Sequence, residues 1–286
     1  MLSANATADS QLRLKYARVI AESCPDELFT EIALTGSSAR GIATRDSDIE
    51  INFWVNDLPE LRSRLHWLKS CGAENIIAHT EPRPDNSYWL NGIYKDIELE
   101  AGWQTVADLD AALTDLIEAR TTDHKALRLA ELVLSAKNLR GSGVLEKWQA
   151  ILQHYPGELS QRLIEDALSN WLTDNWREDR IAKDSFKEDI HRVWRLIFAL
   201  NQQWEINWKY AHHSLASLQI YPHNISQRIW DIQQSHTQLA IPQMLALIAE
   251  TLEFIKTNIT DSQALNDNLQ SICRDTMHRV RELMNN

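Results

Sequence analysis

The chain has 286 residues, enough for one large domain or two modest ones with a substantial core. Its composition, 44% hydrophobic and 24% charged, is typical of soluble globular proteins, and no apolar run approaches the ~20 residues that a membrane helix needs. The formal net charge of −11 disfavours nucleic acid as a partner, because proteins that bind nucleic acid carry a basic surface, and it favours a cationic small molecule. The N-terminus lacks the apolar core of a signal peptide, so we expect a cytoplasmic protein.

The first third of the chain alternates between helix and strand patterns. Residues 10–23 carry apolar side chains at helical spacing and predict an amphipathic helix. Strands are predicted at 29–34 and 48–55, and a helix at 58–68. The three cysteines (Cys24, Cys71 and Cys273) are scattered, without a metal-ligand spacing, and indicate reduced thiols without chemistry.

Acidic side chains alternate with apolar ones in the second predicted strand. Asp48 and Glu50 alternate with Ile49, Ile51 and Phe53. Because side chains in a strand repeat every two residues, Asp48 and Glu50 lie on the same face. Two carboxylates there repel each other unless a cation lies between them, and Mg²⁺ is a hard ion that takes carboxylates together with substrate phosphates. The pattern predicts a magnesium site.

A polar turn precedes this strand. Gly36, Ser37 and Ser38 follow the first strand and stand at a predicted helix N-terminus, where N–H groups favour phosphate. Helix capping explains the two serines equally well. Arg40 comes next, and its guanidinium suits phosphate oxygens, although a surface salt bridge explains it equally well. A phosphate cradle beside a metal-binding carboxylate pair points to metal-assisted nucleotidyl transfer.

These residues resemble the signature of a known superfamily. Gly36-Ser37, followed after ten residues by Asp48-x-Glu50, is similar to the Gly-Ser…Asp-x-Asp/Glu motif of the DNA polymerase β-like nucleotidyltransferases, which include aminoglycoside and lincosamide nucleotidyltransferases. Glu50 stands where Asp is commoner. The resemblance implies two Mg²⁺ ions and a nucleoside triphosphate, most simply ATP, as donor.

A second acidic stretch follows at residues 88–100. Asn91-Gly92 predicts a hairpin tip, and beyond it Asp96, Glu98 and Glu100 alternate with apolar residues. In the superfamily a third carboxylate on a neighbouring strand ligates metal or acts as general base. By resemblance Asp96 is the first choice for this metal ligand and base, and Glu98 is a close rival.

The second half of the chain reads as helical, with a turn at 139–143. We expect an α+β fold in which a mixed-sheet nucleotidyltransferase domain spans residues 1–122 and a helical bundle spans 123–286 and closes the active-site cleft. Segments at 140–148, 155–159 and 196–201 also resemble an uncharacterised bacterial nucleotidyltransferase group. By analogy with related helical domains, Asn201 and Lys209 are candidate nucleotide-binding residues.

The sequence thus predicts an enzyme that moves AMP from ATP onto a hydroxyl of a small acceptor, with an aminoglycoside or lincosamide antibiotic as the leading class. One alternative is a nucleotidyltransferase that AMPylates another protein, or a toxin–antitoxin component. A second is an inactive nucleotide-binding module that retains the fold. The sequence leaves the oligomeric state open.

Overall fold

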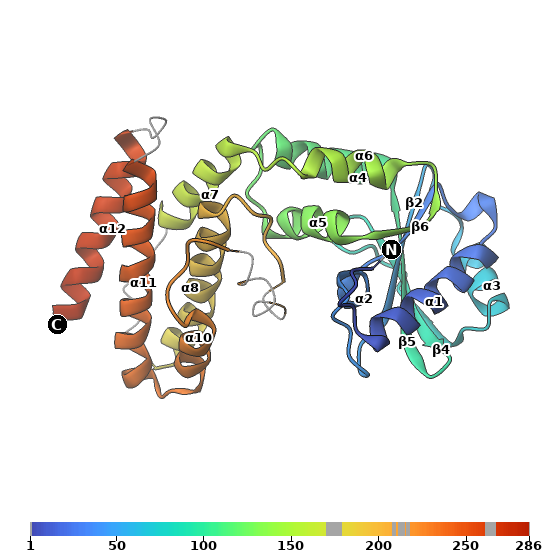
Figure 1. Cartoon of the computed structure of the whole chain (residues 1–286), viewed down its shortest axis with the longest axis horizontal. Helices are drawn as coiled ribbons and strands as arrows, with labels where there is room; N and C mark the ends of the chain where they lie inside the picture. Colours follow the sequence, from blue (N-terminus) through green and yellow to red (C-terminus); the bar gives the residue numbers. More distant parts are fainter. Residues whose placement is uncertain are drawn as a thin grey trace. The chain divides into compact units, whose positions relative to one another are not determined.

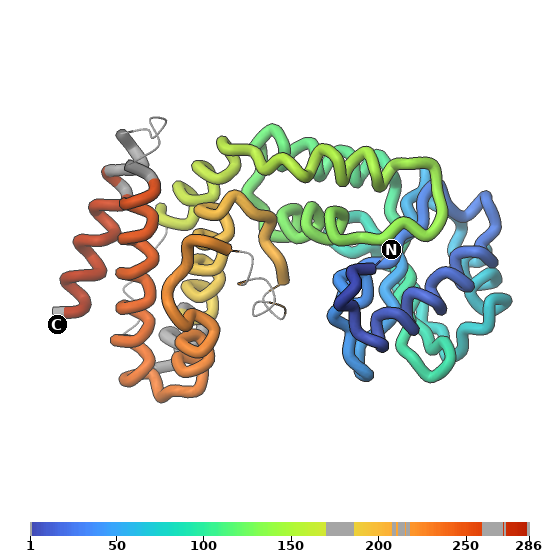
Figure 2. The backbone as a smooth tube through the Cα atoms, viewed as in Figure 1, coloured from blue at the N-terminus to red at the C-terminus, as the bar shows by residue number. Residues whose placement is uncertain are grey.

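The computed structural model describes residues 2–169, 179–207, 210, 215, 218–260 and 267–285 (Figure 2). The chain forms two compact units (Figure 1). Unit 1 comprises Met1–Asp115 and Leu129–His154, and unit 2 comprises Leu116–Arg128 and Tyr155–Asn286. Unit 1 holds the sheet and unit 2 is built from helices.

The sheet of unit 1 has six strands in the order β3-β4-β5-β2-β1-β6. Their bounds are Glu31–Leu34 (β1), Ile49–Val55 (β2), Glu74–Ala78 (β3), Tyr88–Tyr94 (β4), Ile97–Thr105 (β5) and Lys137–Gly141 (β6). The central pair, β2 and β5, is parallel, and the other neighbours are antiparallel. The prediction of an α+β chain with a mixed sheet is confirmed.

One face of the sheet is apolar and covered by helices. Ile49, Ile51 and Phe53 of β2 are fully buried there, together with side chains of α1 (Ala8–Ser23) and α3 (Leu61–Ser70). Phe53 stacks on Trp103 of β5 with ring centroids 4.5 Å apart. Because side chains alternate along a strand, Glu50 of β2 lies on the opposite face.

The β4–β5 hairpin turns later than the sequence predicts. Strand β4 runs through Asn91-Gly92, and the turn falls at Lys95-Asp96, where both residues have positive φ values of 50° and 65°. Two consecutive positive φ values are typical of a two-residue hairpin turn. Gly92 lies inside the strand, and a Cβ at this position would approach the Glu74 carbonyl oxygen of β3 to 3.1 Å. The close approach of β3 therefore favours glycine at this position.

Strand β6 was not expected, because residues 139–143 read as a turn. It pairs with β1, with Lys137 opposite Leu34 and Gly141 opposite Glu31. The segment reaches the sheet after the helices α4 (Val106–Ile117) and α5 (His124–Ser135), and it is followed by α6 (Val144–Leu152). Residues 129–154 therefore group with the sheet in unit 1. The sequence indicated a single boundary near residue 122.

Unit 2 is a helical bundle. Its described helices are α7 (Gly157–Ser169), α8 (Asp179–Leu200), α10 (Ile225–Gln234), α11 (Thr237–Thr260) and α12 (Asp267–Asn285). In the described part of the chain, α11 is the one helix long and apolar enough to cross a membrane. Its residues Met244, Leu247 and Ile248 are buried, and it packs against α8, α10 and α12, as a core helix does.

Candidate active site

Three carboxylates converge on the face of the sheet opposite Ile49, Ile51 and Phe53. Asp48 directly precedes β2, Glu50 lies within β2, and Glu100 lies within β5. The parallel register places Glu50 opposite Glu100. One carboxylate oxygen from each of the three residues lies within 4.8 Å of the others, and all three residues are half-buried.

This donor set fits a hard divalent cation. Three negative charges at this distance repel each other in a half-buried setting, and a cation between them removes the repulsion. Carboxylate oxygens are the ligands that Mg²⁺ and Mn²⁺ prefer, and Mg²⁺ is usually held by one or two carboxylates plus substrate phosphates. The cluster therefore offers enough ligands and leaves coordination positions for a substrate.

The Gly-Ser turn lies against this cluster. Gly36 has a φ of +67°, and a Cβ there would stand 1.8 Å from Oε2 of Glu50, so this position requires glycine for both its backbone conformation and its close approach. The Thr35 N–H donates to the Glu50 carbonyl oxygen at 2.9 Å, and Nδ2 of Asn52 donates to Oγ1 of Thr35 at 2.7 Å. The predicted phosphate-binding turn and the predicted metal pair are therefore one packed unit.

The two serines of the turn are buried. Ser37 is 6% exposed and Ser38 1% exposed, at the start of the five-residue helix α2 (Gly36–Arg40). Oγ of Ser38 donates to the carbonyl oxygen of Asp48 at 3.3 Å, so this hydroxyl holds the protein chain rather than a ligand. Because α2 is so short, its dipole is small, and a phosphate here depends on the N–H groups of the turn.

The carboxylate that lies together with Asp48 and Glu50 is Glu100, whereas the sequence favoured Asp96 with Glu98 as a rival. Asp96 lies in the exposed hairpin turn, not on a strand. Glu98 shares a face of β5 with Glu100 but is exposed and outside the cluster. The alternation of acids at 96, 98 and 100 was visible in the sequence, but the register between β2 and β5, which selects Glu100, was not.

Side chains from β4 and the loop that precedes it surround Glu100. Nδ2 of Asn91 donates to Oε1 of Glu100 at 3.0 Å, and Oδ1 of Asn91 lies 3.1 Å from Nε2 of His79. A guanidinium nitrogen of Arg83 lies 4.0 Å from Oε2 of Glu100. The Asn91 amide fixes one carboxylate oxygen, and the Arg83 guanidinium lies near the other. Sequence reasoning missed Asn91 because it read this residue as a hairpin tip.

Arg40 makes an ion pair. Its Nε donates to Oε1 of Glu131 on α5 at 3.0 Å, and a second guanidinium nitrogen contacts Oε2 of the same residue. The pair is mostly buried, with 12% and 15% of the two side chains exposed. Of the two explanations for Arg40, a phosphate contact or a salt bridge, the structure contains the salt bridge.

Lys137 is a cation near the turn that the sequence did not single out. It lies on β6 opposite Leu34, one residue before the turn begins. Burial and the positive charge of Arg40 lower the pKa of the Lys137 ammonium below its ordinary value. The sequence gives little indication that Lys137 lies near the turn, because residues 137–141 lack the apolar alternation that predicts a strand.

Of the two candidate nucleotide-binding residues in the helical unit, the structure describes Asn201 but not Lys209. The side chain of Asn201 uses its whole amide within the protein: Nδ2 donates to the carbonyl oxygens of Ile197 and Ile220, and Oδ1 accepts from the N–H groups of Gln219 and Ile220. It braces the chain at 219–220 and has no hydrogen-bonding position left for a nucleotide. Lys209 lies outside the described residues.

The three cysteines are unpaired, as expected. Burial raises the pKa of the Cys24 thiol to about 12 and that of Cys273 to about 11, and it also raises the pKa of Cys71. The thiolate is the reactive form of cysteine, so these thiols are inert near neutral pH.

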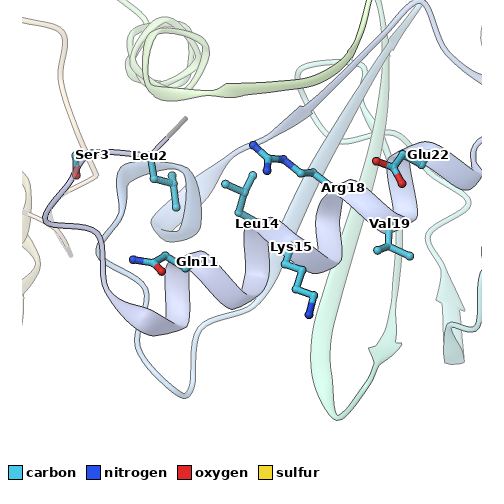
Figure 3. A pocket seen from close by; sticks show the side chains of 8 residues that line it. All are labelled: Leu2, Ser3, Gln11, Leu14, Lys15, Arg18, Val19 and Glu22. Carbon is cyan, nitrogen blue, oxygen red and sulfur yellow. The ribbon is translucent and has the colours of Figure 1, made fainter.

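A separate groove of about 510 Å³ runs along the outer side of α1 (Figure 3). It is lined by Leu2, Ser3, Gln11, Leu14, Lys15, Arg18, Val19 and Glu22. The groove contains none of the candidate site residues predicted from the sequence, and it is open to solvent. The carboxylate cluster therefore remains the candidate site.

No family model and no curated protein sequence matches this chain. The functional conclusion consequently depends on the chemistry of the carboxylate cluster and the turn beside it.

Proposed function

We propose that this chain is a metal-dependent nucleotidyltransferase. The observation that carries the proposal is the convergence of Asp48, Glu50 and Glu100 next to the positive-φ turn at Gly36. In this proposal the three carboxylates hold Mg²⁺, and the N–H groups of the turn bind the triphosphate of a nucleotide. A bound Mg²⁺ ion would neutralise charge on the phosphate oxygens.

The reaction requires attack on a phosphorus atom, departure of pyrophosphate and transfer of one proton. An acceptor hydroxyl attacks the α-phosphorus of ATP, a new oxygen–phosphorus bond forms, and the bond to the β-phosphate oxygen breaks to release pyrophosphate. Glu100 takes up the hydroxyl proton; Asn91 donates to its Oε1 at 3.0 Å, and the Arg83 guanidinium lies 4.0 Å from its Oε2. The fold then supplies positioning and charge neutralisation, the main requirements of phosphoryl transfer.

The acceptor class is part of the proposal. A net charge of −11 and the exposed carboxylate of Glu98 beside the cluster favour an acceptor that carries amino groups, as aminoglycosides do. A cationic small molecule would be attracted to this face, whereas a nucleic acid would be repelled from it.

Calorimetric titration with each of the four nucleoside triphosphates, with and without Mg²⁺, tests the proposal. Wild-type protein is expected to bind one triphosphate in a metal-dependent way, and Asp48→Asn is expected to lose that binding because the cluster loses a charge and a ligand. Metal-independent binding that survives Asp48→Asn would instead support the inactive nucleotide-binding module. If no triphosphate binds, the proposal is wrong.

A further inference from the structure

The N-terminal half of α1 buries polar side chains where its sequence pattern predicts apolar ones. Ser10 is fully buried and Arg13 is 1% exposed, whereas the apolar Leu12 and Val19 are 39% and 46% exposed. A buried charge is costly unless hydrogen bonds compensate for it, so the partners of Arg13 explain its position.

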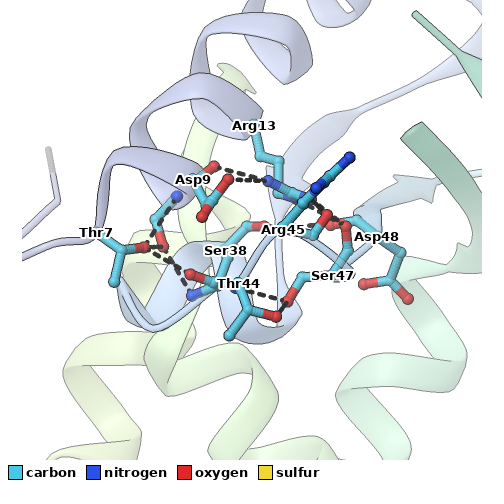
Figure 4. A network of polar contacts seen from close by, with 10 residues as sticks. Thr7, Asp9, Arg13, Ser38, Thr44, Arg45, Ser47 and Asp48 are labelled. Atoms are coloured by element: carbon cyan, nitrogen blue, oxygen red, sulfur yellow. Dashed lines mark hydrogen bonds and ion pairs between the residues drawn. The ribbon is translucent and has the colours of Figure 1, made fainter. Parts of the chain in front are cut away.

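Those partners lie in the loop that leads to Asp48 (Figure 4). Nε of Arg13 donates to the Ser47 carbonyl oxygen at 2.8 Å, and one terminal nitrogen donates to the carbonyl oxygens of Arg45 at 2.7 Å and Ser47 at 2.5 Å. The other terminal nitrogen donates to the backbone and side-chain oxygens of Asp9, at 3.2 and 3.3 Å. The guanidinium thus bridges two carbonyl groups that are two residues apart.

The start of the same loop is held by two hydroxyls of the α1 N-terminus. Oγ1 of Thr7 donates to the Ala43 carbonyl oxygen at 2.7 Å, and the Ala43 N–H donates to Oγ of Ser10 at 2.9 Å. On the far side of the loop, Oγ of Ser38 donates to the carbonyl oxygen of Asp48. The peptide groups before and after Asp48 are therefore both fixed by side chains from other elements.

Asp48 needs this support more than the other members of the cluster do. Glu50 and Glu100 lie within paired strands, whose ladder hydrogen bonds fix their backbone. Asp48 stands before the first residue of β2, at the end of a loop, and loops are the more mobile parts of a fold. Its carboxylate is in place only if the loop is in place.

We propose that Arg13 is a positioning residue for the metal-binding carboxylate of Asp48, a role that rests on the function proposed above. Its planar fork of five donors reaches two carbonyl groups at once. A lysine is a single point charge and cannot reproduce that bridge. Arg13 therefore sets the affinity for the metal without touching the metal itself.

Arg13→Lys tests the proposal through Mn²⁺ affinity, measured by electron paramagnetic resonance, and through amide hydrogen exchange at residues 44–49. We expect Mn²⁺ binding to weaken about tenfold, as it does when a residue supporting a metal ligand is changed, and the amide protons of the loop to exchange faster. Ser10→Ala removes one loop hydrogen bond without a change of charge, and we expect it to weaken Mn²⁺ binding in the same direction by a smaller factor.

Arg64→Lys is the matched control. Arg64 is also a buried arginine of unit 1, at 4% exposure, but its guanidinium lies over the rings of Trp103 and Tyr88, at 5.4 and 5.5 Å from their centroids. We expect this variant to lose stability while its Mn²⁺ affinity stays within about twofold of the wild-type value.

Folded Arg13→Lys protein with wild-type Mn²⁺ affinity would overturn the proposal, as would an equal loss of affinity in Arg64→Lys. If the wild-type protein binds no Mn²⁺, the proposed function itself fails. Hydrogen exchange separates the two cases, because unchanged loop protection in Arg13→Lys would contradict the positioning role whether or not the metal binds.

Discussion

At the scale of single residues, the composition of the candidate site depends on which carboxylates lie close together in the folded chain. Asp96, Glu98 and Glu100 are equivalent in sequence pattern, yet only Glu100 lies opposite Glu50 in the parallel pair. The neighbouring Asn91 amide then holds it at 3.0 Å. The identity of the third carboxylate in the cluster thus follows from strand register rather than from residue type.

Glu100→Gln and Asp96→Asn distinguish the two choices. Removal of the Glu100 charge is expected to weaken Mg²⁺ or Mn²⁺ binding by at least about tenfold, or about 1.4 kcal/mol, because the cluster loses a charged ligand. In metal-free protein the same change is expected to raise the melting temperature, because it relieves repulsion among three carboxylates. Asp96→Asn, in the exposed turn, is expected to change neither quantity. Isothermal titration measures the metal affinity, and thermal unfolding measures the melting temperature. A larger loss of metal affinity in Asp96→Asn than in Glu100→Gln would favour Asp96 as the ligand.

At the scale of elements, one buried carboxylate joins β1 to β6 and α6. Oε2 of Glu31 accepts from the N–H groups of Ser142, Gly143 and Val144, at 2.9, 2.9 and 3.1 Å. Its Oε1 accepts from Nδ2 of Asn138 at 2.7 Å. Glu31 therefore caps the N-terminus of α6, where free N–H groups and the helix dipole favour a negative charge. This contact explains how a polar segment without strand character becomes an edge strand.

Glu31→Ala is expected to destabilise the protein by about 3 kcal/mol, because three N–H groups at the start of α6 lose a charged acceptor. Glu146→Ala is the matched control, since Glu146 accepts from the same Asn138 at 2.6 Å but is exposed. Glu146→Ala is expected to change the free energy of unfolding by no more than about 0.5 kcal/mol. Urea unfolding gives both values, and equal effects of the two changes would show that the cap contributes no stability of its own.

At the scale of the whole molecule, the sheet unit extends through residue 154 and is interrupted by a segment of the helical unit. A chain that ended at residue 122 would lose β6, which pairs with β1, and Glu131, which pairs with Arg40. It would also expose the second edge of β1, with unpaired N–H and C=O groups. Unit 1 is therefore not the N-terminal piece that a single boundary would define.

Two fragments test this organisation. Residues 1–154 are expected to unfold in one cooperative transition, whereas residues 1–122 are expected to unfold broadly or to aggregate, because their sheet edge and the carboxylate of Glu31 are left without partners. Thermal unfolding followed by circular dichroism makes the comparison. An equally sharp transition in the shorter fragment would favour a boundary near residue 122.

The sequence by itself determined what lies within one local segment. The pairing of Asp48 with Glu50 and the α+β character follow from the period of strands and helices, which short stretches of chain express on their own. The turn at Gly36 is marked by the residue type itself. The tertiary structure decided everything that joins distant segments: Glu100 rather than Asp96, β6 beside β1, Glu131 as the partner of Arg40, and Arg13 beneath the loop before Asp48. Strand register and buried ion pairs are set by which segments meet in space, and that information is not periodic in the sequence.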